Sequence, residues 1–519
     1  MLKVPALAKA AAASQSAKPD QNVLTAAKGG GIIFAGSLFQ YAVRFVVGIV
    51  LARTLGVEQY GLYNLSMTVA AVASGLTLMG FTLTLVRYIS LFASQRDTAK
   101  LWGTLQLGVG LPTVLSICAG IGLFALANPV AVYLFHEPRL APLLRLGSLM
   151  IPFLALGDLA AAATRGFKTM HYTVIAQYVS RPVVKLILLG VFLITGLTVG
   201  KAVSAHVVSV IVASLMLVYF LNKLFSLKRP WKSARRETRR MLKFSLPLYV
   251  SYLIQTFRGN LQTVLLGALH TITGVGIFSV ATQVNLIGQM FHSSVVTSSM
   301  PVISELYGRG KRKQMERMYQ TTARWTFALN FPLFLIILMF PGQILSIFGS
   351  SFVDGTTALI ILAWADLAKT GTGICGAVLD MTGRTRLKLV NAIIMSILMV
   401  GLNVLLIPRW GVIGAATATL TAVAADNILR LIEVYILFRL VPYNLSFLKP
   451  ITAGLVAAGT VLLLGRLLPA EASLVYTAVG VITLLVVYAG VILLLGLSEE
   501  DRTVLARLRV RVMALFPRS

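Results

Sequence analysis

The sequence predicts an all-α integral membrane protein of about fourteen transmembrane helices, arranged as two sets of six and a final pair. Apolar residues make up 57% of the chain and charged residues 12%, and the mean hydropathy is +0.84. These values lie outside the range of soluble globular proteins. Apolar runs of about 20 residues, the length that crosses a bilayer as a helix, recur along the chain. The basic residues between these runs collect on alternate loops.

The apolar runs define the predicted helices in chain order, each to within several residues. They cover residues 32–51, 61–84, 101–127, 141–163, 172–195, 202–222, 244–268, 275–299, 323–349, 356–379, 388–407, 412–437, 450–467 and 474–496.

The distribution of Lys and Arg orients these helices. Of the 46 basic residues, 33 fall on one set of alternating loops, five fall on the other set, and eight lie inside or at the edge of apolar spans. Because basic loops stay in the cytoplasm and an even number of helices returns to the starting side, both termini are predicted to be cytoplasmic. The predicted location is the cell membrane.

The basic segment 223–243, with nine Lys and Arg residues, separates the first twelve helices into two sets of six. The predicted divisions are a cytoplasmic N-terminal tail (1–30), an N-lobe (31–222), a basic cytoplasmic linker (223–243), a C-lobe (244–438), a final helix pair (439–497) and a cytoplasmic C-terminal tail (498–519).

The two sets of six also share a short pattern, which predicts a parallel internal repeat. Leu55-Gly56 followed by Tyr60-Gly61-Leu62-Tyr63 in the first set resembles Leu266-Gly267 followed by Val275-Gly276-Ile277-Phe278 in the second.

Several functional classes are disfavoured by the sequence. The net charge of +29 lies between apolar runs, where it meets lipid headgroups rather than nucleic acid. Cys118 and Cys375 sit in apolar spans without disulfide or metal-ligand spacing, and the chain has no phosphate-binding Gly-x-x-x-x-Gly-Lys-Ser/Thr loop. The five histidines are scattered, and His206 and His292 are the two in membrane spans that could carry protons. We therefore expect no catalytic residues, cofactor, metal or nucleic acid.

Three predicted helices carry a polar stripe through an apolar body. The stripes follow the i, i+3, i+7 spacing that places side chains on one helix face. They consist of Ser37, Gln40 and Arg44 in the first helix, Gln255, Arg258 and Gln262 in the seventh, and Thr282, Asn285 and Gln289 in the eighth. The amides fit either contacts between helices or a polar cavity.

The charged residues inside the spans favour an anionic substrate. Arg181 and Lys185 lie four residues apart and repel each other unless an anion lies nearby, and Asp158 on the preceding helix can neutralise one of them. Asp366 with Lys369, and Asp426 with Arg430 and Glu433, have the spacing of intrahelical salt bridges. Subtracting these pairs leaves Arg44, Arg258, Arg181 and Lys185 as a positive set that suits phosphate oxygens.

The motifs resemble those of the polysaccharide transporters, the oligosaccharide flippases of the multidrug/oligosaccharidyl-lipid/polysaccharide superfamily. Ala52-Arg53-Thr54-Leu55-Gly56 with Tyr60-Gly61-Leu62-Tyr63 is similar to their signature at the first hairpin. Further similar strings are Phe244-Ser245-Leu246-Pro247-Leu248, Met300-Pro301-Val302-Ile303-Ser304, and Leu402-Asn403-Val404-Leu405-Leu406-Ile407-Pro408 with Gly411-Val412-Ile413-Gly414-Ala415-Ala416. The resemblance covers residues 30–437.

This resemblance implies two six-helix lobes around a central cavity and alternating access, which moves a lipid-diphosphate-linked oligosaccharide to the outer leaflet. We hypothesise that Arg44 and Arg258 bind the diphosphate, together with Arg181, Lys185 and Arg53, the last of which also fits a helix-end anchor. The residues expected at the sugar are Gln40, Gln255, Gln262, Asn285 and Gln289. Arg44 departs from the family pattern, so its role is inferred from physics.

Three alternatives remain open. A multidrug antiporter of the same superfamily implies a carboxylate-lined site, which the basic set argues against. A lipid II flippase shares the helix count and a cationic cavity, and a membrane polymerase or ligase needs a large catalytic outer loop, which the sequence does not have. Asp158, Asp366 and Asp426 are candidates for ion coupling. Expected partners are the lipid-linked oligosaccharide, membrane lipids and polysaccharide-assembly proteins.

Overall fold

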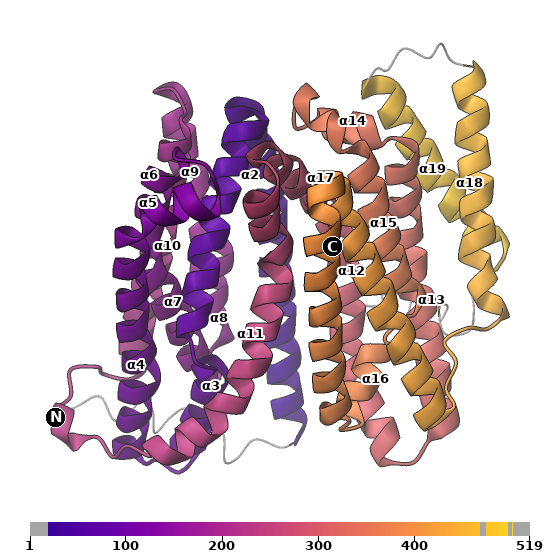
Figure 1. Ribbon diagram of the computed structural model, residues 1–519. Coiled ribbons are helices and arrows are strands. Elements are labelled where there is room, and N and C mark those ends of the chain that lie inside the picture. The colour runs from indigo at the N-terminus through magenta and orange to yellow at the C-terminus, as the bar shows by residue number, and fades with distance from the viewer. Residues whose placement is uncertain (1–18, 468–473, 497–500, 502–519) are drawn as a thin grey trace, which may run out of the picture. The chain divides into compact units, whose positions relative to one another are not determined.

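All elements of the described chain are helices (Figure 1). The structure is a computed structural model that describes residues 19–467, 474–496 and 501. By its internal contacts the chain divides into two units, residues 1–279 and residues 280–519. Most of the long helices within each unit run roughly alongside one another (Figure 1).

The first unit contains the helices up to α11 and the start of α12. Their bounds are α2 (Pro19–Thr77), α3 (Phe81–Ser94), α4 (Thr98–Ala125), α5 (Ala127–Pro129), the π-helix η1 (Val130–Leu134), α6 (Leu140–Ser148), α7 (Met150–Gly166), α8 (Met170–Thr173), the π-helix η2 (Val174–Ser180), α9 (Arg181–Ile194), α10 (Val199–Leu224), the 3₁₀-helix η3 (Trp231–Ser233) and α11 (Thr238–Leu269).

The second unit begins within α12 (Ile272–Gly308). It continues with α13 (Arg312–Met339), α14 (Pro341–Ser346), the 3₁₀-helix η4 (Ser350–Gly355), α15 (Thr356–Gly371), α16 (Cys375–Met381), α17 (Thr385–Phe438), the 3₁₀-helix η5 (Leu445–Phe447), α18 (Leu448–Leu467) and α19 (Leu474–Leu494).

Each of the fourteen predicted ranges lies largely within helix, and ten helices of the described chain are long and apolar enough to cross a membrane. Two of the ten, within α2 and α17, are 43 and 53 residues long, about twice what one crossing needs. Each of these two helices bends at a glycine with positive φ: α2 at Gly56 (φ 74°, ψ 172°) and α17 at Gly411 (φ 53°, ψ −123°). A residue with a side chain would be strained in this backbone conformation. The count of fourteen crossings stays a prediction, as do the lobe boundaries.

Several predicted ranges differ from the structure. The range 61–84 is interrupted between Thr77 and Phe81, where Gly80 (φ 72°) lies so close to α11 that a Cβ would collide with the Ser245 carbonyl. The range 356–379 is interrupted at Gly373 (φ 71°), and α13 begins at Arg312 rather than residue 323. The N-terminal tail 1–30 is helical from Pro19. Its residues 1–18, and nearly all of the C-terminal tail 498–519, lie outside the described residues.

Helix α7 forms the centre of the first unit. Its Ala160, Ala161, Ala162 and Ala163 are fully buried, and the helix packs against α3, α4 and α10. Small side chains allow the backbones of membrane helices to approach closely. The alanine run of the sequence therefore sets the spacing of the helices around it.

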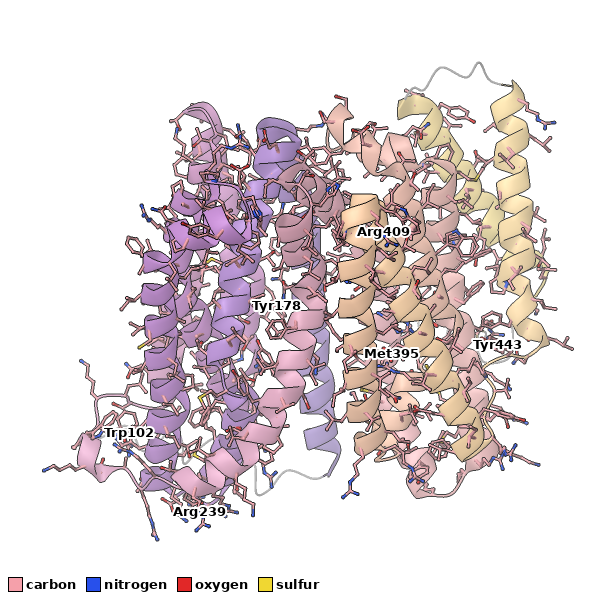
Figure 2. The ribbon with its side chains drawn as sticks, viewed as in Figure 1. Trp102, Tyr178, Arg239, Met395, Arg409 and Tyr443 are labelled. Carbon is pink, nitrogen blue, oxygen red and sulfur yellow. The ribbon has the colours of Figure 1, made fainter. Side chains whose placement is uncertain are left out.

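The basic segment between α10 and α11 packs on the end of α4 rather than extending away from it. Trp102 Nε1 donates to the Pro230 carbonyl at 3.1 Å, Gln106 Nε2 donates to the Trp231 carbonyl at 3.2 Å, and Arg236 Nη2 donates to Gln106 Oε1 at 2.8 Å. Figure 2 shows Trp102 and Arg239 at the same end of the unit. The predicted basic linker is thus held against the bundle by hydrogen bonds.

Two glycines of the repeated pattern meet at a helix crossing within the first unit. A Cβ at Gly61 would collide with the Ile272 carbonyl, and a Cβ at Gly276 would collide with the Val57 carbonyl and lie 3.3 Å from the Gly61 nitrogen. The contact is reciprocal, because each glycine faces the carbonyl that lies four residues before the other. The second arm of α2 and the start of α12 therefore touch backbone to backbone.

A cluster of charges joins helix α2 to the loop between η1 and α6 in the first unit and gives a pH-dependent prediction. Arg139 binds Glu137 at 2.7 Å and Glu58 at 2.5 Å, and the hydrogen bond from Arg139 lowers the pKa of Glu137. Because the folded-state pKa is lowered, this contact stabilises the protein above the unfolded pKa of about 4.3 and is lost as pH falls through the folded value. We expect Glu137→Gln to lower the unfolding temperature more at pH 7 than at pH 3, as thermal unfolding in detergent would measure. An equal loss at both values would contradict the assignment.

Candidate functional site

A chain of hydrogen bonds joins three helices of the first unit. Lys185 Nζ of α9 donates to the Tyr63 hydroxyl of α2 at 2.8 Å, and this hydroxyl lies 3.1 Å from His206 Nδ1 of α10. The Arg181 Nη2 atom of α9 lies 3.2 Å from His206 Nε2. Tyr63 is 5% exposed, so the chain runs through the interior of the unit. The two cations that are neighbours on α9 are thus linked through two neutral side chains rather than through an anion.

The donor and acceptor roles in this chain follow from the groups themselves. A guanidinium can only donate, so His206 Nε2 must accept from Arg181 and the neutral ring carries its hydrogen on Nδ1. That hydrogen is donated to the Tyr63 oxygen, which also accepts from Lys185. Both lone pairs of Tyr63 are then used, and none of the described contacts uses its own hydrogen. Tyr63 can therefore donate a hydrogen bond to a further acceptor, such as an anion.

Arg44 and Asp158 complete the electrostatic surroundings of the chain. Arg44 interacts electrostatically with Tyr63, Arg181 and Lys185. Asp158 interacts in the same way with Arg181 and accepts a hydrogen bond from Gln177 Nε2 at 3.2 Å. With all four groups ionised, Arg44, Arg181, Lys185 and Asp158 carry a net charge of +2. We call these four, with Tyr63 and His206, the basic cluster.

Local backbone features place the members of the basic cluster. A Cβ at Gly36 would lie 2.5 Å from Val174 Cγ1 and 3.1 Å from Tyr178 Cδ2, so the first arm of α2 packs closely on η2 two turns before Arg44. Tyr178 lies partway along the bundle (Figure 2). The π-helix η2 ends just before Pro182, which lacks the N–H of a regular helix and crowds the carbonyl four residues back. Arg181 and Lys185 are therefore the first and fifth residues of the α-helix α9, which follows the π-helix directly.

The structure brings together some of the predicted substrate residues and separates others. Arg44, Arg181 and Lys185 belong to the basic cluster, and the half-buried Gln40 lies one turn before Arg44. Arg53 is exposed nine residues further along α2, roughly 13 Å along the helix axis. On α11 Gln255 is exposed, Arg258 is half-buried and Gln262 is buried. Asn285 (buried) and Gln289 (exposed) belong to the second unit.

The predicted salt bridges of the second unit form only in part. Arg430 Nη2 binds Asp426 Oδ2 at 2.9 Å as expected, but Glu433 instead accepts two hydrogen bonds from Asn391, at 2.8 and 2.9 Å. In the described part of the chain Asp366 and Lys369 form no ion pair, so that prediction is wrong. Asp366 is directed towards α12 and α13, as its neighbours Gly288 and Asn330 show.

Tyr63 and His206 are the members of the basic cluster that sequence reasoning did not assign to the substrate site, although it names His206 as a possible proton carrier. Tyr63 belongs to the hairpin motif, but its hydroxyl contacts come from residues more than one hundred positions away. His206 lies in an apolar span, where a lone histidine is ambiguous. The signal that could have found them is a histidine and a pair of like charges in consecutive membrane helices.

Two protein families match this chain in sequence. A family described as "Polysaccharide biosynthesis protein" matches residues 26–307, and a second, described as MatE, matches residues 247–405. The chain is 29% identical over 207 residues to "Probable low-salt glycan biosynthesis flippase Agl15" of Haloferax volcanii, covering 40% of this chain and 43% of that protein. It is 27% identical over 265 residues to "Probable flippase AglR" of the same organism, covering 50% and 52%. The chain thus spans about half the length of these relatives.

Two solved membrane transporters match the fold of this chain. The fold matches "Lipid II flippase MurJ, inward closed conformation" with a TM-score of 0.72 at 14% identity, covering 89% of this chain and 98% of that one. It matches an inward-facing multidrug resistance MATE family transporter with a TM-score of 0.64 at 17% identity, covering 77% and 94%. At these identities the likeness concerns the fold. Together with the apolar helices, these matches identify a multi-pass membrane protein.

Proposed function

The chain belongs to the polysaccharide biosynthesis protein family, and from this premise we propose that it is a flippase that translocates a lipid-diphosphate-linked oligosaccharide across the cytoplasmic membrane by alternating access. Its partners are the lipid-linked oligosaccharide, the surrounding lipids and the proteins that assemble the polysaccharide. It performs transport rather than covalent chemistry. Both termini lie in the cytoplasm, on the side of the basic loops.

The basic cluster is the observation that carries this proposal. A diphosphate inside a membrane needs cations and hydrogen-bond donors to replace the water that it loses. Arg44, Arg181 and Lys185 supply the charge, and the Tyr63 hydroxyl supplies a neutral donor between them. The predicted sugar contacts, Gln40 and the amides of α11 and α12, remain part of the proposal.

The same cluster distinguishes this function from export of organic cations. A cationic drug would meet a net charge of +2 at the basic cluster, and like charges in a low-dielectric site repel strongly. Cells without efflux pumps that express the protein are therefore expected to remain drug-sensitive. Protection against several cationic drugs would favour an antiporter instead.

Reconstitution tests the proposal directly. Liposomes contain the full chain and a fluorescent lipid-diphosphate oligosaccharide, and a reagent that cannot cross the membrane reports the fraction in the outer leaflet. We expect the protein to equilibrate this lipid between leaflets and to leave the matched lipid monophosphate without sugar in place. Failure to move the diphosphate lipid, or equal movement of both lipids, would contradict the proposed substrate.

A further inference from the structure

Two side-chain oxygens from different helices converge beside α12 in the second unit. A Cβ at Gly288 would lie closer than 3.0 Å both to Asn330 Oδ1 of α13 and to Asp366 Oδ2 of α15. Gly288 has no side chain, so both oxygens reach the same point against the α12 backbone. Asn330 is 3% exposed, and this point therefore lies inside the packed unit.

Both converging groups present acceptors. Asn330 Nδ2 donates to the Thr326 carbonyl at 3.1 Å, which directs the Oδ1 end of the amide towards Asp366. Within the described residues, neither Asn330 Oδ1 nor Asp366 Oδ1 has a hydrogen-bond partner. An amide oxygen and a carboxylate oxygen cannot bond to each other without a hydrogen or a cation between them. A buried acceptor without a partner is unfavourable, so the arrangement favours a hydrogen on Asp366 Oδ2, the carboxyl oxygen that lies beside Asn330 Oδ1.

The charged groups around Asp366 include a cation, Lys369, with which its carboxylate can pair in a second position. Lys369, three residues along α15, interacts electrostatically with Asp366, and His292 of α12 and Arg430 of α17 interact with Lys369 in turn. Arg430 is held by Asp426 at 2.9 Å, and Arg324 of α13 by Asp501 at 2.7 Å. The short helix η4 carries Asp354, and α14 carries no titratable side chain.

We propose that Asp366 is an exchangeable-proton site with two positions. In the neutral state the carboxyl donates its hydrogen to Asn330 Oδ1, and in the ionised state the carboxylate turns to form the ion pair with Lys369 that the i, i+3 spacing allows. The proton comes from water and returns to water. A Na⁺ ion at the same point would have the Lys369 ammonium as a neighbour, which favours the proton. Use of this proton to drive transport rests on the proposed function, whereas the protonation itself does not.

Infrared difference spectroscopy of the full chain in lipid tests the site without any cargo. As pH rises from about 5 to about 9, across the interval in which perturbed carboxyls titrate, the carbonyl stretch of a buried carboxylic acid is expected to disappear. Asp366→Asn should diminish this change while keeping a donor for Asn330. Asp380→Asn is the matched control, because Asp380 binds Lys388 at 2.7 Å outside the site, and it should keep the change. A spectrum in which Asp366→Asn titrates like the native chain overturns the proposal.

Two further variants test the contacts while the carboxyl stays in place. In Asn330→Asp two opposed carboxyls share one proton, because both cannot ionise at that separation, so the acid band should survive to higher pH. In Lys369→Met the ionised carboxylate loses its cation, so the band should also survive to higher pH. An unchanged titration in both variants would show that these contacts do not govern the proton. Loss of the band when Na⁺ replaces choline at constant pH would assign the site to a metal cation and overturn the proposal.

A transport experiment distinguishes failure of the proton site from failure of the proposed function. In liposomes that move the lipid-linked oligosaccharide, a pH gradient should change the rate for the native chain and for Asp380→Asn, and leave the rate of Asp366→Asn unchanged. If no lipid moves while the acid band still titrates at Asp366, the proposed function fails and the proton site stands. If lipid moves and Asp366→Asn responds to the gradient like the native chain, the proton has no part in coupling.

Discussion

Arg181→Ala is expected to slow translocation of the lipid-linked oligosaccharide by roughly 10- to 100-fold, which corresponds to the loss of a charge-assisted hydrogen bond of about 1.5–3 kcal/mol. Arg181 lies in the basic cluster and donates to His206 Nε2 at 3.2 Å. Its removal takes away one of the three cations and leaves the histidine nitrogen without its donor. The initial rate of flipping in liposomes measures the effect.

A second substitution separates the charge of Arg181 from its structural hydrogen bond. Arg181→Gln keeps an N–H donor for His206 but carries no charge, so it should be nearly as slow as Arg181→Ala if the cation binds the diphosphate. Arg181→Lys keeps the charge and should recover part of the rate. Arg139→Ala is the matched control, because Arg139 is an exposed arginine engaged by Glu58 and Glu137. Native rates for Arg181→Gln would show that Arg181 only orients His206.

Gly61→Ala is expected to destabilise the first unit by about 1–3 kcal/mol, the usual cost of overpacking a tight contact. The new Cβ collides with the Ile272 carbonyl, and a backbone atom cannot move aside as a flexible side chain can. Gly276→Ala meets the Val57 carbonyl and should cost a similar amount. Thermal unfolding in detergent, followed by size-exclusion chromatography, measures both losses.

The double substitution and a matched control make this prediction sharper. Once one Cβ has pushed the second arm of α2 away from α12, the other has room, so Gly61→Ala with Gly276→Ala should cost less than the sum of the two. Gly110→Ala in α4 has nothing within 4 Å of the new Cβ and should stabilise the helix slightly, since alanine favours helix over glycine. Additive losses, or a loss for Gly110→Ala as large as that for Gly61→Ala, would contradict the crossing.

The helices could be predicted from the sequence because few backbone structures can cross a lipid bilayer. A backbone in hydrocarbon must satisfy its own hydrogen bonds, so an apolar run of sufficient length implies a helix, and the predicted ranges lie largely in helices. The sequence does not show where a helix breaks inside a run. The interruption before Phe81 depends on α11 packing against Gly80, a contact between residues far apart in the sequence.

The charged residues of the candidate site could be predicted from the sequence, but the hydrogen bonds that link them could not. Arg181 and Lys185 stood out as like charges in a membrane span, but Tyr63 and His206, which join them, come from helices on either side in the sequence. The salt bridge expected between Asp366 and Lys369 failed for a similar reason. Spacing along a helix shows which neighbours are within reach, whereas Asn330 and Gly288, on other helices, decide which way the carboxyl turns.

The crossing of Gly61 and Gly276 has a consequence for the origin of the chain. Each partner presents the same element to the other, a glycine and the carbonyl four residues before it. This reciprocity is the geometry of an isologous interface, in which one patch meets a second copy of itself across a two-fold axis. A single ancestral copy carrying this glycine could pair with its twin without any new surface. If the predicted parallel repeat arose by joining two such copies in one polypeptide, the contact between Gly61 and Gly276 would be kept within the chain.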